Sequence, residues 1–245
     1  MEKFSIDEAI QYGWNMMKAN IGFFIIVLLI VFVVQMVPAV ISSLIEKTMP
    51  VLSTVISILS GLINLIMGIG LIHIALKLHD DRNPSLQDLF SSGAALIFKY
   101  FVSSLMYGLI IAGVVIALIA PVAATAVIAG KSHVFLIGTL AAVAIAAGII
   151  LVTWLMLKFQ FYGYLIIDQN LGAVEALNKS AALTRGAKGQ LLILGLVLGL
   201  INIAGCMVLF VGLFASVPVS MMAMAYVYRK LAKLGDVQTR PAAGD

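Results

Sequence analysis

Three amide side chains are the first candidates for chemistry, because each one interrupts a long apolar run. Gln35, Asn64 and Asn202 each lie near the middle of such a run. An amide group donates and accepts hydrogen bonds, and lipid offers it no partner, so we expect it to face other helices. Either the three amides hold helices together by hydrogen bonds, or they line a shared polar site near the membrane midplane.

Histidines and carboxylates suggest a second kind of site, a metal centre, at the end of one apolar run. His73 and His79 are followed there by Asp80 and Asp81. Residues six apart on a helix point about 240° apart, so the two histidines do not share a face. The single cysteine, Cys206, excludes a thiolate cluster and an intramolecular disulfide. We therefore expect neither a metal site nor a cofactor.

Sequence motifs for catalysis are also lacking. The chain contains no nucleophile elbow, no phosphate-binding glycine loop, no zinc-binding helix motif and no pair of carboxylates placed for acid–base work. We therefore predict that the protein is not an enzyme.

Composition places most of the chain in a membrane. Of its 245 residues, 62% are hydrophobic and 11% are charged, whereas soluble domains have about 45–50% and about 25%. The net charge of +4 is compatible with nucleic-acid binding, but the basic residues lie at the ends of apolar runs, which indicates membrane orientation instead. The first residues, MEKFSIDEAIQ, are polar and acidic, unlike a cleavable signal peptide.

The apolar runs predict six transmembrane helices within a single membrane domain, 1–245. One run ends before Pro121, and the last divides at VGLFASVP, where Gly212 can end one helix and Pro218 suits the first turn of the next. The predicted fold is an all-α, polytopic membrane bundle with spans at about 21–45, 51–78, 94–120, 134–166, 189–211 and 216–232.

The distribution of basic residues supports six spans independently. If both termini are cytoplasmic, 13 of the 15 lysines and arginines fall on the inside, and only Lys47 and Lys131 fall outside. A five- or seven-helix interpretation would spoil this asymmetry. We therefore expect a multi-pass protein of the cytoplasmic membrane with both termini inside.

Polar stretches before the first, third and fifth spans predict amphipathic surface helices at about 5–18, 85–92 and 172–185. Ser5 and Glu8 have the spacing of a capping box at the start of the first. We expect these helices to lie on the cytoplasmic surface with their apolar faces in the headgroup layer.

Alignment of the first polar stretch with the last also brings Gln35 onto Asn202 and Pro38 onto Gly205. This correspondence suggests a threefold repeat of about 83 residues, each unit being a surface helix followed by a transmembrane hairpin. Alternatively, the similarity reflects only the amphipathic segments that commonly precede spans in polytopic proteins.

Small residues and basic residues provide further candidate contacts. Gly108 with Ala112, and Gly195 with Gly199, are spaced for close helix packing or for self-association. Basic residues on the inner face suit anionic lipid headgroups, either as specific contacts or only as an orientation signal. The candidate lipid contacts are Lys158, Lys179, Arg185, Lys188, Arg229 and Lys230.

The stretch YLIIDQNLGAVEALNKSAALTRGAKGQLLILGLVLGLINIAG, with Pro218 and a later AYVYRKL, resembles a broad family of poorly characterised bacterial multi-pass membrane proteins. That family is similar to the membrane domain attached to some glycerophosphodiester phosphodiesterases. The resemblance covers most of the chain. It implies a bacterial cytoplasmic-membrane protein, but it supplies no catalytic residue, and we expect no phosphodiesterase domain in this chain.

Together these patterns favour a non-enzymatic, lipid-interacting scaffold or accessory protein. The alternative is a transporter or channel for a small or amphiphilic molecule, with the three amides lining its polar midplane site. A third class, an intramembrane lipid enzyme, requires a catalytic cluster that the sequence does not provide. The expected partners are the lipid bilayer, with anionic lipids at its cytoplasmic face, and a partner protein or a second copy, but no nucleic acid.

Overall fold

The computed structural model describes residues 3–129, 133–208 and 210–239, and within these ranges it contains helices and no strand. This confirms the predicted fold class, a helical membrane bundle. The elements are α1 (Ile6–Ala19), α2 (Ile21–Ile45), α3 (Pro50–His79), the 3₁₀ helix η1 (Leu86–Leu89), α4 (Ala94–Ala129), α5 (Val134–Phe159), α6 (Tyr162–Gln169), α7 (Ala173–Leu183), α8 (Lys188–Met207) and α9 (Leu213–Thr239).

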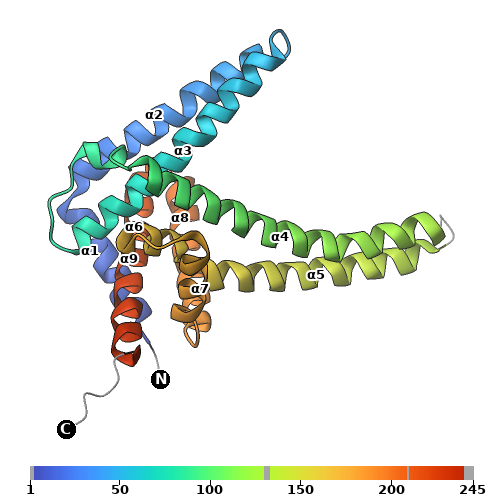
Figure 1. Ribbon diagram of the computed structural model, residues 1–245. Coiled ribbons are helices and arrows are strands. Elements are labelled where there is room, and N and C mark those ends of the chain that lie inside the picture. The colour runs from blue at the N-terminus through green and yellow to red at the C-terminus, as the bar shows by residue number, and fades with distance from the viewer. Residues whose placement is uncertain (1–2, 130–132, 209, 240–245) are drawn as a thin grey trace.

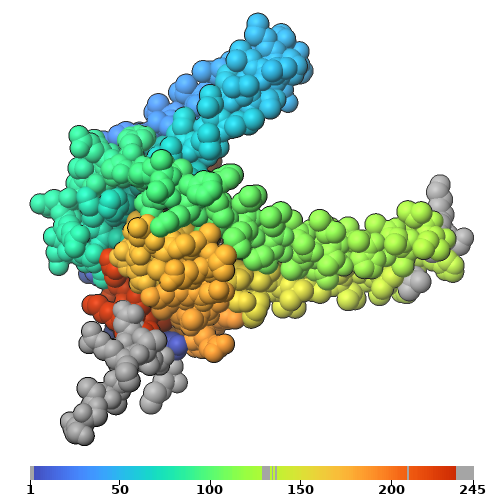
Figure 2. All heavy atoms as spheres, in the orientation of Figure 1, coloured from blue at the N-terminus to red at the C-terminus, as the bar shows by residue number. Residues whose placement is uncertain are grey.

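Two long helical hairpins project from a compact body (Figure 1). The pairs α2–α3 and α4–α5 form the hairpins, and each stands clear of the other as a separate rod in Figure 2. The body gathers α1, α6, α7 and α9 around the C-terminal end of α3, and α8 packs against α9 and α5. The chain therefore divides into a packed region and two extended apolar arms.

Five of the described helical stretches are long and apolar enough to cross a membrane: α2, α3, α4, the stretch Ile137–Gln169 and α8. No residue in the most apolar window of α4 is buried, and the largest buried share among the five windows is 22%, in α8. Helices that are apolar all round and lack a protein cover need lipid around them. These helices mark the chain as a membrane protein.

The sixth predicted span, 216–232, lies in α9, which is not among these five. The apolar part of α9 ends at Tyr228, because Arg229 and Lys230 follow it. Its apolar side chains are instead covered by protein, since α9 runs through the core of the body. Its wholly buried residues include Val219, Met222, Ala225 and Val227.

Two predicted spans differ from the helices at one boundary each. α4 continues through Pro121 to Ala129 instead of ending at 120, since a long apolar helix can tolerate the one hydrogen bond that proline removes. The predicted span 134–166 is interrupted after Phe159, where the Phe161 N–H donates to Ser180 Oγ at 3.2 Å. A side chain of α7 thus fixes the turn between α5 and α6.

Two shorter elements also differ from their predicted extents. The predicted span 189–211 ends at Met207, just after Gly205, where the backbone lies so close to Gly212 that a Cβ on either glycine would collide. The predicted surface helix at 85–92 is only the short 3₁₀ helix η1, although Ser85 and Asp88 form a capping box there.

The surface elements dock on protein instead of lying with their apolar faces in the headgroup layer. A Cβ on Gly13 of α1 would collide with the α9 backbone at Val219, and a Cβ on Gly70 of α3 would collide with the η1 backbone at Leu89. Glycine permits such a close approach because it has no side chain. Gly13 and Met17 of α1 and Leu177 of α7 are correspondingly buried in protein, whereas Trp14 and Val174 stay exposed, so the predicted placement is wrong for only part of each apolar face.

The three surface elements follow one order of docking. Each of them contacts the second helix of a hairpin: α1 contacts α9, η1 contacts α3, and α7 contacts α5. The threefold repeat predicts a surface helix followed by a hairpin and implies no order of docking, and α7 also contacts α4 and α6. The repeat itself stays a prediction.

Candidate functional site

The structure does not gather the three predicted amides into one site. Gln35 and Asn64 are exposed on the α2–α3 hairpin. Asn202 lies between α8 and α9, where its Nδ2 donates to Ser220 Oγ at 2.9 Å. For Asn202 this geometry fits the interpretation of an interhelical hydrogen bond, and these three side chains form no shared midplane cavity.

An apolar groove of about 590 Å³ lies between α4 and α5. Its lining is almost wholly aliphatic and includes Val115, Ile119, Ala144 and Ile149, with Thr153 near one end. Such a surface offers van der Waals contact but few hydrogen bonds, so it suits hydrocarbon better than a polar solute.

A cluster of charged and polar side chains joins the C-terminal ends of α3 and α6 to the C-terminal half of α9, and we call it the arginine junction (Asp80, Asp168, Tyr228 and Arg229). The Arg229 guanidinium donates to Asp80 at 2.6 Å and to Asp168 at 2.7 Å. The Tyr228 hydroxyl donates to the same Asp168 oxygen at 2.7 Å. Because two carboxylates neutralise Arg229, it acts as a clamp between helices instead of the predicted lipid contact.

His79 lies beside this junction in an aromatic environment. Its ring centroid is 5.1 Å from that of Tyr12 and 6.1 Å from that of Tyr226. Burial raises the pKa of Tyr12 to about 12. Within the described part of the chain, no three histidine, cysteine or carboxylate side chains form a group that could hold a metal ion.

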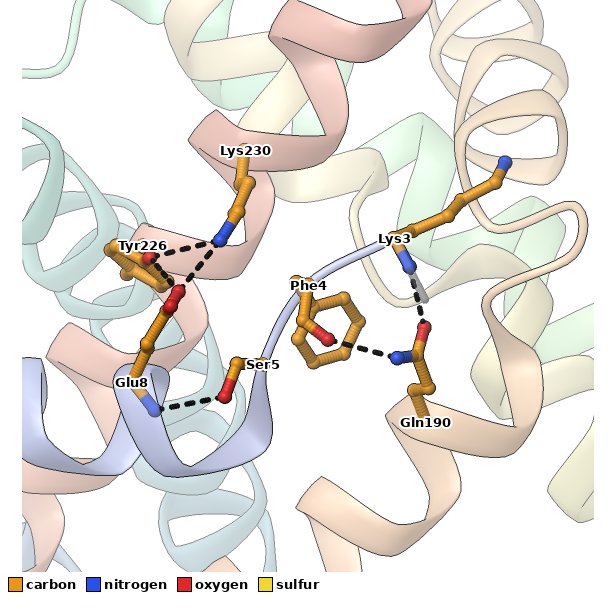
Figure 3. A network of polar contacts seen from close by, with 7 residues as sticks. All are labelled: Lys3, Phe4, Ser5, Glu8, Gln190, Tyr226 and Lys230. Atoms are coloured by element: carbon orange, nitrogen blue, oxygen red, sulfur yellow. Dashed lines mark hydrogen bonds and ion pairs between the residues drawn. The ribbon is translucent and has the colours of Figure 1, made fainter. Parts of the chain in front are cut away.

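The N-terminal segment joins α8 to the rest of the body (Figure 3). The Lys3 backbone N–H donates to Gln190 Oε1 at 3.1 Å, and Gln190 Nε2 donates to the Phe4 carbonyl at 2.8 Å. One side chain at the start of α8 thus satisfies both a donor and an acceptor of the backbone that leads into α1. The predicted Ser5 cap is present as well, since the Glu8 N–H donates to Ser5 Oγ at 3.4 Å.

Glu8 connects α1 to α9 (Figure 3). Its carboxylate accepts from Lys230 Nζ at 2.7 Å and from the Tyr226 hydroxyl at 2.9 Å. The hydrogen bond from Lys230, and then that from Tyr226, lowers the pKa of Glu8 below its ordinary value. Lys230, a second predicted lipid contact, is therefore occupied by an ion pair within the protein.

Lys158, Arg185 and Lys188 form a basic cluster beside Trp154. The Nζ atoms of Lys158 and Lys188 lie 5.0 Å and 3.9 Å from the centre of the Trp154 rings. Arg185 is exposed in the turn before α8, and its charge and that of Lys158 both act on Lys188. The ion pairs within the described ranges use other cations. Lys179, another predicted lipid contact, donates to Gln169 at 2.6 Å instead.

Hydrogen bonds from α7 and from the N-terminal segment hold the basic cluster in place. The hydroxyls of Ser180 and Thr184 donate to the Lys158 carbonyl at 3.1 Å and 3.2 Å. The Lys3 side chain donates to the Arg185 carbonyl at 2.6 Å, and the turn continues through Gly186, whose φ of +78° favours glycine. Three segments that are distant in sequence therefore converge on this cluster.

The predicted packing residues do not pack within the chain. A Cβ added to Gly108, Gly195 or Gly199 would meet nothing within 4 Å, and Ala112 is exposed. The close approaches use other glycines, such as Gly13. Gly13 has the same four-residue spacing from Ala9, and both are buried in α1, but the rule was applied only to the predicted spans.

Sequence reasoning also missed the carboxylates of the arginine junction. Asp168 follows the apolar run YLII, and Asp80 follows the end of α3. Both positions resemble ordinary solvated helix ends, and only the tertiary structure brings them to Arg229. The signal that could have found them is that each carboxylate directly follows an apolar run.

Comparison with known proteins places the chain in a family without assigning a function. Neither the search of curated proteins nor the search of solved structures gives a match. No comparison supports the resemblance to the membrane domain of glycerophosphodiester phosphodiesterases, which stays a prediction. One family matches residues 4–238, nearly all of the chain. The chain therefore belongs to the family described as Domain of unknown function (DUF7847).

Proposed function

We propose that this protein is a non-enzymatic scaffold of the bacterial cytoplasmic membrane, in which lipid-embedded hairpins hold a folded body at the cytoplasmic surface. The observation that carries this proposal is the exposure of the hairpins. No residue in the most apolar window of α4 is buried, and only 11% of that of α2 is. Helices with so little protein contact are suited to anchoring in lipid.

The body supplies the second half of the proposal, a fixed surface at the membrane boundary. The ion pair between Lys230 and Glu8 joins α9 to α1, and Arg229 joins α9 to the end of α3. Because α1 and α9 pack together, the proposal places both ends of the chain on one side of the membrane, with α9 returning across the membrane beside α8 inside its protein cover. The concentration of basic residues near the body favours the cytoplasmic side.

A transporter would need a different distribution of polar groups. A pathway for a polar solute requires polar side chains on a common face or cavity. Here the groove between α4 and α5 is lined almost entirely by apolar side chains, and the midplane amide Asn202 is bonded to Ser220. These observations favour the scaffold over the transporter.

Spin labelling in lipid nanodiscs tests the scaffold proposal directly. Cys206 is replaced by alanine, and single cysteines are introduced one at a time along 105–118 of α4 and then labelled. Collision rates with oxygen, which concentrates in lipid, are compared with those of a water-soluble nickel chelate. A label at the buried Met222 of α9 provides the protected control.

The proposal predicts high oxygen and low nickel accessibility on the faces of α4 that are turned away from α5, and low accessibility to both reagents at Tyr107, Ile111 and Val114, which pack against the cluster of Leu155 and Phe159. A stripe of nickel accessibility that recurs every 3.6 residues would reveal a water-lined pathway. That result would overturn the scaffold proposal in favour of transport.

A further inference from the structure

We propose that the basic cluster of Lys158, Arg185 and Lys188, together with Trp154, binds the phosphate of an anionic phospholipid from the adjoining leaflet. This inference rests on the proposed function, because it requires the hairpins to lie in lipid. It deepens that function by naming the class of lipid and the residues that select it.

The first observation is the concentration of uncompensated positive charge. Lys158 and Lys188 place their ammonium groups over the same Trp154 ring system, at 5.0 Å and 3.9 Å from its centre. The ion pairs found in the described part of the chain belong to Lys77, Arg229 and Lys230. Two ammonium groups over one ring system repel each other, and an anion between them relieves the repulsion.

The second observation is that the protein holds these charges together through bonds of its own. Ser180 and Thr184 fasten the end of α5 to α7 through the Lys158 carbonyl. Lys3 fastens the following turn through the Arg185 carbonyl. These bonds fix the backbone from which the side chains of Lys158 and Arg185 extend, so less backbone freedom is lost when a ligand binds. The contrast with Arg229 and Lys230 is that those cations already have carboxylate partners.

The third observation points to a lipid as the source of the phosphate. Trp154 is 44% exposed at the end of an apolar helix, the position that indole side chains favour at a membrane interface. On α8, helical spacing places Leu192, Gly195 and Gly199 on the face that begins at Lys188. Leu192 is exposed, and the two glycines leave open space beside the helix. A headgroup phosphate at the cluster would therefore have an apolar surface next to it for its acyl chain.

Lysine and arginine also suit this ligand chemically. Ammonium groups bind phosphate as point charges, and a guanidinium can donate two parallel hydrogen bonds to it. The positive end of the α8 dipole at Lys188 adds to the attraction. A zwitterionic headgroup carries its own cation, so the cluster favours a lipid with net negative charge.

Fluorescence quenching by brominated lipids tests the site. A Trp14→Phe variant leaves Trp154 as the only tryptophan, since the chain has two. The protein is reconstituted into vesicles of phosphatidylcholine and phosphatidylglycerol in equal amounts. Bromine is carried on the acyl chains of one lipid or of the other, and quenching of Trp154 by each gives the relative local concentration of the two lipids.

We expect stronger quenching by brominated phosphatidylglycerol, by a factor on the order of five for each cation that contacts the headgroup. Lys158→Gln with Lys188→Gln should reduce the preference to the roughly fivefold contribution of Arg185, and Lys158→Arg with Lys188→Arg should keep the full preference. Lys179→Gln is the matched control, because Lys179 is bonded to Gln169 outside the cluster, and it should keep the preference. Inorganic phosphate at matched ionic strength should leave the lipid preference unchanged.

Each contrary result has a separate meaning. Equal quenching of the unaltered site by the two lipids, or a preference that the double glutamine variant leaves undiminished, overturns the site while leaving the scaffold proposal intact. Loss of the preference on addition of inorganic phosphate shows a site for the free anion instead of the lipid. If neither brominated lipid quenches Trp154, the residue is not at the membrane, and the proposed function fails with the site.

Discussion

In the body, α9 buries Val219, Met222 and Ala225 completely, whereas in α4 no residue of the most apolar window is buried. α9 is less apolar along its length than α4, and the two helices are covered by different materials. The body is fastened by glycine contacts and by ion pairs between helices distant in sequence. The hairpins have mainly their own antiparallel partner. The difference indicates that tertiary packing stabilises the body and that lipid must stabilise the hairpins.

The largest difference in stability between the two regions is expected when the same side chain is added to a glycine in each. Gly13→Val should destabilise the protein by about 3 kcal/mol or more, since its Cβ would collide with the α9 backbone, which has little room to move. Gly108→Val should be close to neutral, because a Cβ there meets nothing within 4 Å. Thermal unfolding in mild detergent, followed by circular dichroism, gives both values. Equal losses in the two variants would contradict the distinction between the regions.

Within the body, the ion pairs of Arg229 and Lys230 should contribute differently to stability. Arg229→Met should cost about 2–3 kcal/mol, because it leaves Asp80 and Asp168 without their cation in a partly buried place. Lys230→Met removes a more exposed ion pair, with side chains 37% and 57% exposed, and should cost less stability than Arg229→Met. Denaturation of the two variants under identical conditions measures the difference. A larger loss for Lys230→Met would show that the junction does not hold the body together.

A smaller effect is expected from acid at η1. Burial opposes ionisation of Asp88, but hydrogen bonds from the Lys77 side chain and the Ser85 backbone overcome it and lower the pKa of Asp88 below its ordinary value. The ionised carboxylate therefore contributes stability above the unfolded-state pKa, near 3.8, and this contribution is lost as the pH falls through the lower folded-state pKa.

Asp88→Asn should accordingly be less stable than the unaltered protein at neutral pH, and the difference should shrink as the pH falls below about 4. Melting temperatures of the two proteins from pH 7 to pH 3 measure it. Ser91→Ala is a nearby control that leaves the ion pair intact and should show no such convergence. A difference that is constant over this range would exclude the ionised carboxylate as its cause.

The hairpins were largely predictable from the sequence, and the body was not. The span 21–45 coincides with α2, because continuous apolar residues and helix length are local properties. The break after Phe159 depends on Ser180, a residue of another helix, and the burial of α1 depends on Gly13 meeting α9. Such contacts leave no periodic signal in a single sequence, which explains why the surface helices were wrongly expected to face the headgroups.

The residues of the candidate site were likewise only partly predictable from the sequence. Lys158, Arg185 and Lys188 could be identified as a basic inner face from their positions at the ends of apolar runs. Arg229 and Lys230 fit the same pattern, and only the structure shows that carboxylates occupy them. Charge at a helix end is visible in the sequence, but the partner of that charge is decided by tertiary contacts.

The distance between the tips of the two hairpins tests whether lipid covers each hairpin separately. Spin labels at Thr48 and Ile128, both exposed, report this distance by pulsed electron resonance in nanodiscs, in a Cys206→Ala background. We predict widely separated tips, as in Figure 1, because lipid covers each hairpin separately. A dominant population at the separation of packed helices, about 8–10 Å between axes, would show that the hairpins close into one bundle and would contradict the account.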